Sequence, residues 1–373
     1  MNKAAEIFSP GDFLLEELEA RGWTQVELAE ILGRPTTLVS GIITGKRQIT
    51  PDTAIQLGDA LGTGPELWMN LESQFQLSKV KPSTNLVARK AKLYEKFPVR
   101  EMIKRGWIEA SESIEVLEQQ FLKFFGIPDL DTTPVFSHAA KKSNAIDEIT
   151  AKQLAWLFRA KILASSQVTK KYNPDALKNA LPKLSALLSA PEETRHVSKI
   201  LTGCGVKYVI VEPFSGSKID GACFWLDNTQ PVIALSLRLD RIDNFWFVLR
   251  HEIEHVIQGH GKDIGYILDS DSEVQDINVI AEEEKIANMA ADDFCVPKSE
   301  LDNFYARVYP LFSEHKVKMF AQRLGIHMGI VVGQLQKKLD RYDYLRGKGY
   351  QEKIRNHATI GALTDGWGFL DTN

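Results

Sequence analysis

Two histidines stand four residues apart in the stretch RHEIEHVIQGH, and a glutamate follows the first of them. On a helix this spacing places His251 and His255 one turn apart on the same face, so both imidazoles can reach one ion. The carboxylate of Glu252 then stands beside the first ligand, where it can act as the general base of a metal-dependent peptidase. The alternative is an amphipathic surface helix whose charged residues form salt bridges.

A catalytic zinc needs a third protein ligand and keeps a fourth position for water. His260 does not have the spacing for this role. The HExxHxxGxxH pattern places its third histidine six residues after the second, whereas His260 follows His255 by five. We therefore expect His260 to be a polar residue at the end of the helix.

The segment EEEKIANMAADDF supplies a better third ligand. On a helix, one face of this segment carries Glu284, Ala287, Asn288 and Ala291. The alanines allow a close approach to the helix of the histidines, which places Glu284 at the ion and Asn288 beside a ligand as its hydrogen-bond partner. Glu283 is the second choice. We expect Zn2+, although two histidines and a carboxylate also suit Mn2+ or Fe2+.

The elements that must position these residues are a small sheet and the helices after it. The runs GVKYVIVEPF, GACFWLD and PVIALSL are rich in β-branched and aromatic residues, which predicts short strands. The next segment, RIDNFWFVLRHEIEHVIQG, has apolar residues at helical spacing, which predicts a core-facing helix. Helices are expected over most of the remaining chain, so the predicted fold class is α+β and mainly helical.

The N-terminal part of the chain predicts a second kind of chemistry. The stretch TQVELAEILGRPTTLVSGIITGKR has the spacing of two short helices joined by a tight turn at residues 33–35. Ala29 is small where the two helices would cross. This is the geometry of a helix-turn-helix, whose second helix enters the DNA major groove. The alternative is a helical bundle that binds protein alone. The expected core residues of the motif are Leu28, Ile31, Leu32, Leu38 and Ile42.

The side chains around this second helix suit DNA contacts. Short hydroxyl groups can meet base edges or phosphates, and basic groups flank them. Acidic residues outnumber basic ones up to Lys79, which favours a site-specific binder with a narrow positive edge. The DNA-contacting residues expected on these grounds are Arg34, Thr36, Thr37, Ser40, Thr44, Lys46 and Arg47.

The chain divides into four parts by composition. Residues 1–78 are the all-helical DNA-binding domain, 79–202 a basic linker and helical connector, 203–345 the metal domain and 346–373 a polar C-terminal tail. The basic positions of the linker are Lys79, Lys81, Arg89, Lys90 and Lys92. No apolar run approaches the roughly 18 residues of a membrane span, so no membrane partner is expected. The three cysteines, far apart and odd in number, favour a reducing cytoplasm.

Residues 9–78 resemble the XRE-type helix-turn-helix of the HigA antitoxin family, on the segments SPGDFLLEELEARGWTQVELAEILG and GIITGKRQITPDTAIQLGDALGTGPELWMNLESQFQL. The resemblance implies a homodimeric repressor that binds an inverted-repeat operator, with a toxin-like protein as partner. It also implies that Gln25 contacts DNA and that residues 36–47 read it. This chain departs from the family at Arg34–Thr37, where a small-Arg-Ala sequence is usual.

Residues 203–339 are similar to the ImmA/IrrE metallopeptidases, on the segments DGACFWLDNTQPVIALSLRLDRIDNFWFVLRHEIEH, EEKIANMAADDFCVP and GIHMGIVVGQLQKKL. The resemblance implies a zincin-like domain with His251, His255 and Glu284 as ligands and Glu252 as catalytic base. Glu254 stands where the family commonly has glycine, adding negative charge near the site. Met328 replaces the proline of a His-Pro-Gly segment, which leaves the role of His327 open.

Two functions remain open, and a third, a free-standing protease with a purely structural N-terminus, is the weakest. The first is a transcriptional regulator with an active zinc peptidase of narrow specificity for a regulatory protein. The second is an antitoxin-like repressor whose peptidase-fold domain senses a partner without cleaving it. The complete HExxH pattern favours the first function, because a site kept for shape alone does not require Glu252.

Overall fold

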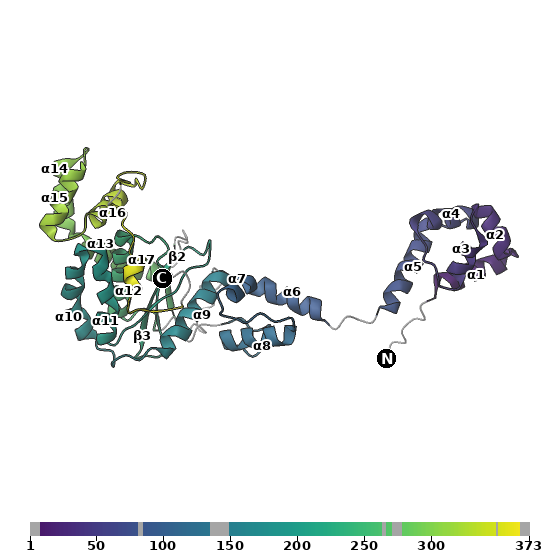
Figure 1. Ribbon diagram of the computed structural model, residues 1–373, viewed down its shortest axis with the longest axis horizontal. Coiled ribbons are helices and arrows are strands. Elements are labelled where there is room, and N and C mark those ends of the chain that lie inside the picture. The colour runs from purple at the N-terminus through teal and green to yellow at the C-terminus, as the bar shows by residue number, and fades with distance from the viewer. Residues whose placement is uncertain are drawn as a thin grey trace, which may run out of the picture. The chain divides into compact units, whose positions relative to one another are not determined.

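A computed structural model of the chain describes residues 8–80, 85–134, 149–262, 266–270, 278–347 and 350–365. The chain forms two compact units, Met1–Arg89 and Lys90–Asn373, called here the N-terminal unit and the second unit. Figure 1 shows the elements of both units along the chain. In the described part, no helix is long and apolar enough to cross a membrane.

The N-terminal unit is built from helices with clear sequence-encoded ends. Thr24 begins α2 with a capping box, in which its hydroxyl accepts from the Glu27 N–H and the Glu27 carboxylate accepts from the Thr24 N–H. Gly33 ends α2 in the left-handed conformation, with φ of 62°. The described helices of the unit are α1 (Pro10–Arg21), α2 (Gln25–Leu32), α3 (Thr36–Ile43), α4 (Pro51–Leu61) and α5 (Pro65–Lys79).

The core of the N-terminal unit joins all five of these helices around Trp68, whose indole donates to the Thr63 hydroxyl. Ala29 is buried at 2% exposure, as expected at the crossing of α2 and α3. The expectation for Ile31 was wrong: its side chain is 51% exposed. Ile31 falls on the solvent side of α2, because the core reaches this helix through Leu28, Ala29 and Leu32.

The second unit is organised around a mixed sheet with the strand order β4-β2-β3-β1-β5. Strand β3 runs parallel to β1 and antiparallel to β2, and β4 is antiparallel to β2. The three expected strand regions therefore form β1 (Lys207–Ile210), β2 (Ile219–Trp225) and β3 (Pro231–Leu235). Strands β4 (Tyr266–Ser270) and β5 (Leu363–Thr364) were not predicted from the sequence.

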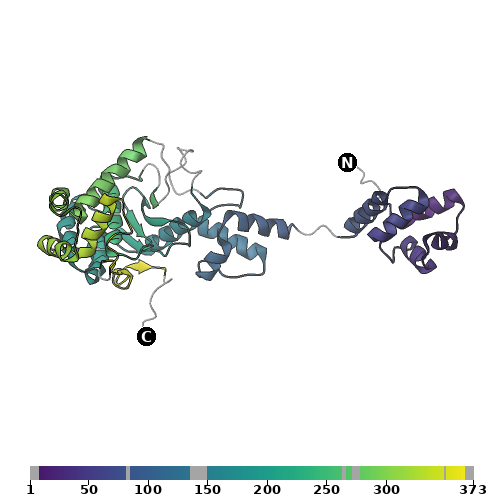
Figure 2. The same cartoon turned by 90° about the horizontal axis from the view of Figure 1, so that it is seen from above.

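Helices cover both faces of this sheet (Figures 1 and 2), which explains why β1–β3 are buried along their full length. On one face, Ala222, Phe224 and Val232 share a core with α6 (Leu86–Lys96), α7 (Val99–Lys104), α8 (Ile114–Phe125) and α9 (Ala151–Ser166). The other face packs against α10 (Pro174–Ser185), α11 (Val197–Gly203), α12 (Ile242–Gln258) and helices from later in the chain. These later helices are α13 (Asn278–Cys295), α14 (Lys298–Val308), α15 (Glu314–Leu324), α16 (Met328–Leu339) and α17 (Arg355–Ala358).

Segment 79–202 contributes directly to this architecture. Arg89, Lys90 and Lys92, three of the basic positions assigned to the linker, lie on α6, and Lys92 forms an ion pair with Asp131. Lys81 lies outside the described residues. Because α6–α9 share a core with the sheet, these helices belong, from Lys90 onward, to the second unit and do not form a separate connector.

The described part of the C-terminal segment also packs on the second unit. Ile354 and Ala358 are buried in the core, and β5 pairs in parallel with β1. Arg355 forms an ion pair with Glu212 at 2.5 Å. Polar composition predicts a tail over residues 346–373, yet Tyr350, Ile354 and Ala358 are buried in the core.

Candidate metal centre and DNA interface

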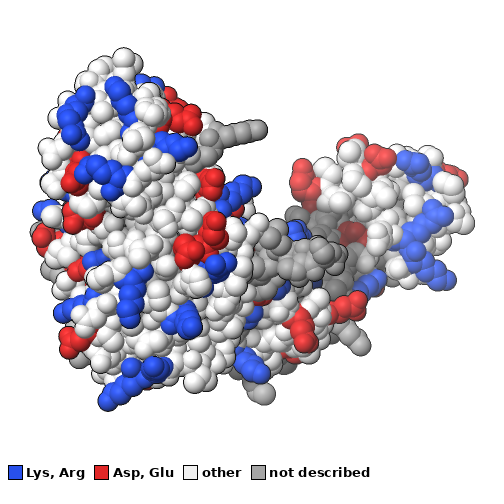
Figure 3. Space-filling view, turned by 60° about the vertical axis from the view of Figure 1, so that its left-hand side comes forward, with Lys and Arg blue, Asp and Glu red and all other residues white. Residues whose placement is uncertain are grey.

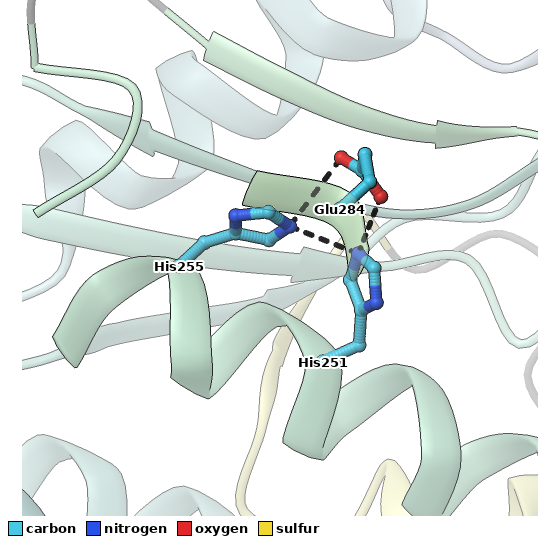
Figure 4. Close-up of side chains that lie close together, drawn as sticks. All are labelled: His251, His255 and Glu284. Atoms are coloured by element: carbon cyan, nitrogen blue, oxygen red, sulfur yellow. Dashed lines mark hydrogen bonds and ion pairs between the residues drawn. The ribbon is translucent and has the colours of Figure 1, made fainter. Parts of the chain in front are cut away.

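Helices α12 and α13 bring three ligand-type side chains of the second unit together (Figure 4). The Nε2 atoms of His251 and His255 lie 2.9 Å apart. The Glu284 carboxylate lies 3.2 Å from His251 Nε2 and 3.5 Å from His255 Nε2. The close packing of the two helices follows from the alanine face of α13, where Ala287 and Ala291 are fully buried.

The donor set and its spacing fit a tetrahedral zinc ion. Bonds of about 2.0–2.2 Å at tetrahedral angles place ligand atoms about 3.4 Å from one another. The three distances of 2.9, 3.2 and 3.5 Å lie on both sides of this value. The histidines are buried, whereas the Glu284 side chain is 30% exposed, so the cluster has a side that faces solvent.

Hydrogen bonds on the far side of each imidazole direct the ligand atoms inward. His251 Nδ1 lies 3.1 Å from Asn288 Oδ1, so it donates to this amide oxygen and leaves Nε2 as the lone-pair atom. Burial, followed by the neighbouring His251 and His260, lowers the pKa of His255 to about 2, which keeps this imidazole neutral. Neutral nitrogens that face a carboxylate form a set of electron-pair donors, which a cation stabilises.

The expected catalytic base, Glu252, is fully buried against strand β2. A Cβ atom at Gly221 would lie 2.7 Å from Glu252 Oε1 and 2.8 Å from Val248 Cγ1, so glycine makes the room for this carboxylate. The charge of Glu252, together with burial as the larger cause, raises the pKa of the Cys223 thiol well above its usual value. The arrangement thus places a buried carboxylate one residue from a ligand.

Two further glutamates considered from the sequence lie outside the cluster. Glu283, the second-choice ligand, faces His260 with its Oε1 3.9 Å from Nε2. Glu254 forms a buried ion pair with Arg250 at 2.6 Å and also accepts from Gln258. The extra negative charge expected near the site is therefore compensated within helix α12.

The two remaining histidines of interest differ in position. His327 is the N-cap of α16: its Nδ1 accepts from the Gly329 N–H at 3.1 Å, and its own N–H donates to the Leu188 carbonyl. His327 therefore stabilises the start of α16.

The expectation that His260 is simply a polar residue at the helix end was incomplete, because its Nδ1 lies 2.9 Å from Nδ1 of His255.

The expected DNA-contacting residues lie on α2, on α3, in the turn between these helices and in the turn after α3. Gln25 is the first residue of α2, and Thr36 and Thr37 form the exposed first turn of α3. Lys46 and Arg47 are exposed in the following turn, where the Arg47 stem packs on Gly41. This places short polar side chains on the helix that a helix-turn-helix inserts into the major groove, with cations at its C-terminal end.

Two of the residues expected to contact DNA form hydrogen bonds within the N-terminal unit. The Arg34 guanidinium donates to Gln56 at 3.0 Å, and the Thr44 hydroxyl donates to the Ser40 carbonyl at 2.7 Å. Arg34 therefore joins the turn to α4, and Thr44 closes the end of α3. On the face of the second unit drawn in Figure 3, acidic and basic side chains are interspersed.

Comparison with known proteins identifies the N-terminal unit. The helix-turn-helix family model matches residues 14–68. An uncharacterized HTH-type transcriptional regulator of Escherichia coli, YddM, is 29% identical over 84 residues, which cover 22% of this chain and 89% of that protein. The antitoxin HigA-1 of Vibrio cholerae is 40% identical over 70 residues, which cover 18% of this chain and 66% of that protein.

A solved structure adds to this list. The addiction module antidote protein of the HigA family from Coxiella burnetii is 33% identical; the match covers 24% of this chain and 94% of that one, with a TM-score of 0.19. The N-terminal unit is thus a DNA-binding helix-turn-helix domain of the XRE type with HigA antitoxins among its homologues. These matches span less than a quarter of the chain.

Proposed function

We propose that the protein is an antitoxin-like transcriptional regulator whose second unit is a zincin-like, zinc-dependent peptidase of narrow specificity. The observation that carries the peptidase half is the cluster of His251, His255 and Glu284, whose atoms are spaced for one zinc ion. The resemblance of residues 203–339 to the ImmA/IrrE metallopeptidases, noted from the sequence, agrees with this proposal.

The residues of the second unit have distinct roles in this proposal. Zinc, when bound, polarises the scissile carbonyl and makes a bound water acidic near neutral pH. Glu252 takes up the proton of the attacking water and passes it to the leaving amine. Gly221 keeps the Glu252 carboxylate against β2, and Asn288 holds His251 with Nε2 directed inward. Mn2+ or Fe2+ can use the same ligands.

The N-terminal unit directs the protein to its DNA site in this proposal. We propose that two copies bind an inverted repeat through α3, with half-sites about 34–36 Å apart. The protein partner is a regulatory protein that the second unit cleaves, or a toxin-like protein bound as in the HigA antitoxins. A cytoplasmic location follows from these partners, and the three free, buried cysteines suit a reducing compartment.

The decisive experiment compares the host proteome with the wild-type protein and with Glu252→Gln. Quantitative N-terminal mass spectrometry should find a small number of new protein ends in cells with the wild type alone. Both proteins should bind zinc, because Glu252 is not in the ligand cluster. If both bind zinc and neither produces new ends, the second unit is a sensor that does not cleave.

A further inference from the structure

The two histidines of the metal cluster have different outer partners. His251 Nδ1 contacts the neutral side-chain amide of Asn288 at 3.1 Å. His255 Nδ1 contacts a third imidazole, His260 Nδ1, at 2.9 Å. On its other side, His260 Nε2 lies 3.9 Å from Glu283 Oε1. His255 is therefore the first member of a chain that passes through an imidazole to a carboxylate.

The backbone holds His260 in this position. Gly259 ends α12 with φ of 74°, and the His260 N–H then donates to the carbonyl of His255 at 2.9 Å. The indole of Trp225, at the end of strand β2, donates to the His260 carbonyl at 2.9 Å. Lys262 covers the same indole, with its Nζ 4.2 Å from the ring centroid. His260 is thus fixed by the helix end and by the sheet.

The contacts determine where the protons lie. His255 must present a lone pair at Nε2 to act as a ligand, so its Nδ1 carries the proton. That proton can be donated to His260 if Nδ1 of His260 is unprotonated. His260 then carries its own proton at Nε2, toward Glu283, and a carboxylate there stabilises this tautomer.

We propose that His260 and Glu283 form an outer relay that selects the zinc-binding tautomer of His255 and strengthens it as a ligand. His260 is a positioning residue that acts through His255, and Glu283 acts through His260. This inference rests on the proposed zinc site. It gives Glu283 a role different from that of its neighbour Glu284, which lies in the cluster itself.

The test measures zinc affinity of the full-length chain by competition with a chromophoric chelator. We expect His260→Ala to weaken binding about 10–100-fold, the usual effect of removing an outer-shell partner. Glu283→Gln should give a smaller loss in the same direction. The matched control is Glu282→Gln, which removes the same charge from an exposed position on the same helix and should leave the affinity unchanged.

Two measurements separate this relay from a general packing role. In the His260→Ala background, Glu283→Gln should have no further effect, because the route to His255 is already broken. His260→Gln, whose amide oxygen can accept from His255 Nδ1, should recover much of the affinity lost in His260→Ala. The absorption bands of bound Co2+ should shift in His260→Ala and stay unchanged in Glu282→Gln.

The outcomes distinguish the relay from the zinc site. If the wild type binds no zinc, the proposed function fails together with the relay. If the wild type binds zinc and the affinities of His260→Ala and Glu283→Gln equal that of the wild type, the relay is wrong and the zinc site stands. Additive losses in the double variant would also overturn the relay.

Discussion

The surface expected to contact DNA and the candidate metal cluster are built in opposite ways. The expected DNA contacts fall within residues 25–47, on two adjacent helices and the turns that follow them, and most of their side chains are exposed. The metal cluster is largely buried and joins α12 to α13, with strand β2 beneath its expected base. One site is local and open, whereas the other is assembled from distant segments and enclosed.

This difference determines what a substitution changes. A side chain exposed on α3 can be replaced at little cost to the fold, because surface substitutions usually alter stability by less than about 0.5 kcal/mol. A side chain in the metal cluster packs against its neighbours and forms hydrogen bonds or ion pairs with them. Substitutions there should therefore change both the site and the free energy of unfolding.

The largest effect is expected at the ligands. His255→Ala or Glu284→Ala removes one of three electron-pair donors, so zinc affinity should fall by more than the about 10–100-fold typical of outer partners. Metal content after dialysis against a weak chelator measures this loss. Glu252→Gln is the matched control and should keep its zinc. Full zinc content in Glu284→Ala would show that another residue is the third ligand.

The next largest effect is expected at Gly221, which lies against the side chains of Glu252 and Val248. A methyl group there would lie within 3 Å of Glu252 and Val248, so Gly221→Ala should lower the free energy of unfolding by about 1–3 kcal/mol through overpacking. It should also impair cleavage while zinc remains bound. Gly203→Ala is the control, because nothing lies within 4 Å of its added Cβ. Equal stability of the two variants in denaturant titrations would contradict the close approach.

The two units should also respond to pH with opposite sign. Burial, although opposed by Arg355, raises the pKa of Glu212 in the second unit to about 7. Its contribution to stability is complete below the ordinary value of 4.5 and is lost as the pH rises through 7. In the N-terminal unit, the Thr24 N–H, followed by its hydroxyl, lowers the pKa of Glu27, so this contribution is lost as the pH falls.

Unfolding measurements between pH 4.5 and 8 test the Glu212 part. Glu212→Gln should flatten the pH dependence by an amount on the order of 1–3 kcal/mol, since one pKa unit corresponds to about 1.4 kcal/mol. Glu27→Gln is the comparison and should leave this range unchanged. If the free energy of unfolding of the wild type, relative to Glu212→Gln, increased as the pH rose through 7, the assigned sign would be wrong.

The smallest effects are expected from substitutions on the protein surface that should contact DNA. These substitutions separate the affinity for DNA from the preference for one sequence. Arg47→Ala should weaken binding to all sequences and reduce the slope of log affinity against log salt by about 1. Thr37→Ala should alter the preference among operator variants and leave the salt slope unchanged. Gel-shift titrations at several salt concentrations measure both effects. A uniform affinity loss in Thr37→Ala would contradict the assignment of α3 as the reading helix.

Much of the architecture was predictable because it depends on neighbours in sequence. The β-branched runs of β1–β3 appear where they were expected, and the capping box at Thr24 and the left-handed glycine after α2 are local patterns of the same kind. The spacing of His251 and His255 on one helical face has the same origin, as does the alanine face that carries Glu284. Periodicity alone places such side chains on a common surface.

Other features were decided by the tertiary structure, because they depend on which distant segments pack together. No local pattern shows that Gly221 lies beneath Glu252, or that Trp225 holds the carbonyl of His260. Ile31 has the spacing of a core residue and yet faces solvent. The pairing of β5 with β1 likewise joins segments about 150 residues apart in the chain, a contact whose energy comes from burial and backbone hydrogen bonding and not from local propensity.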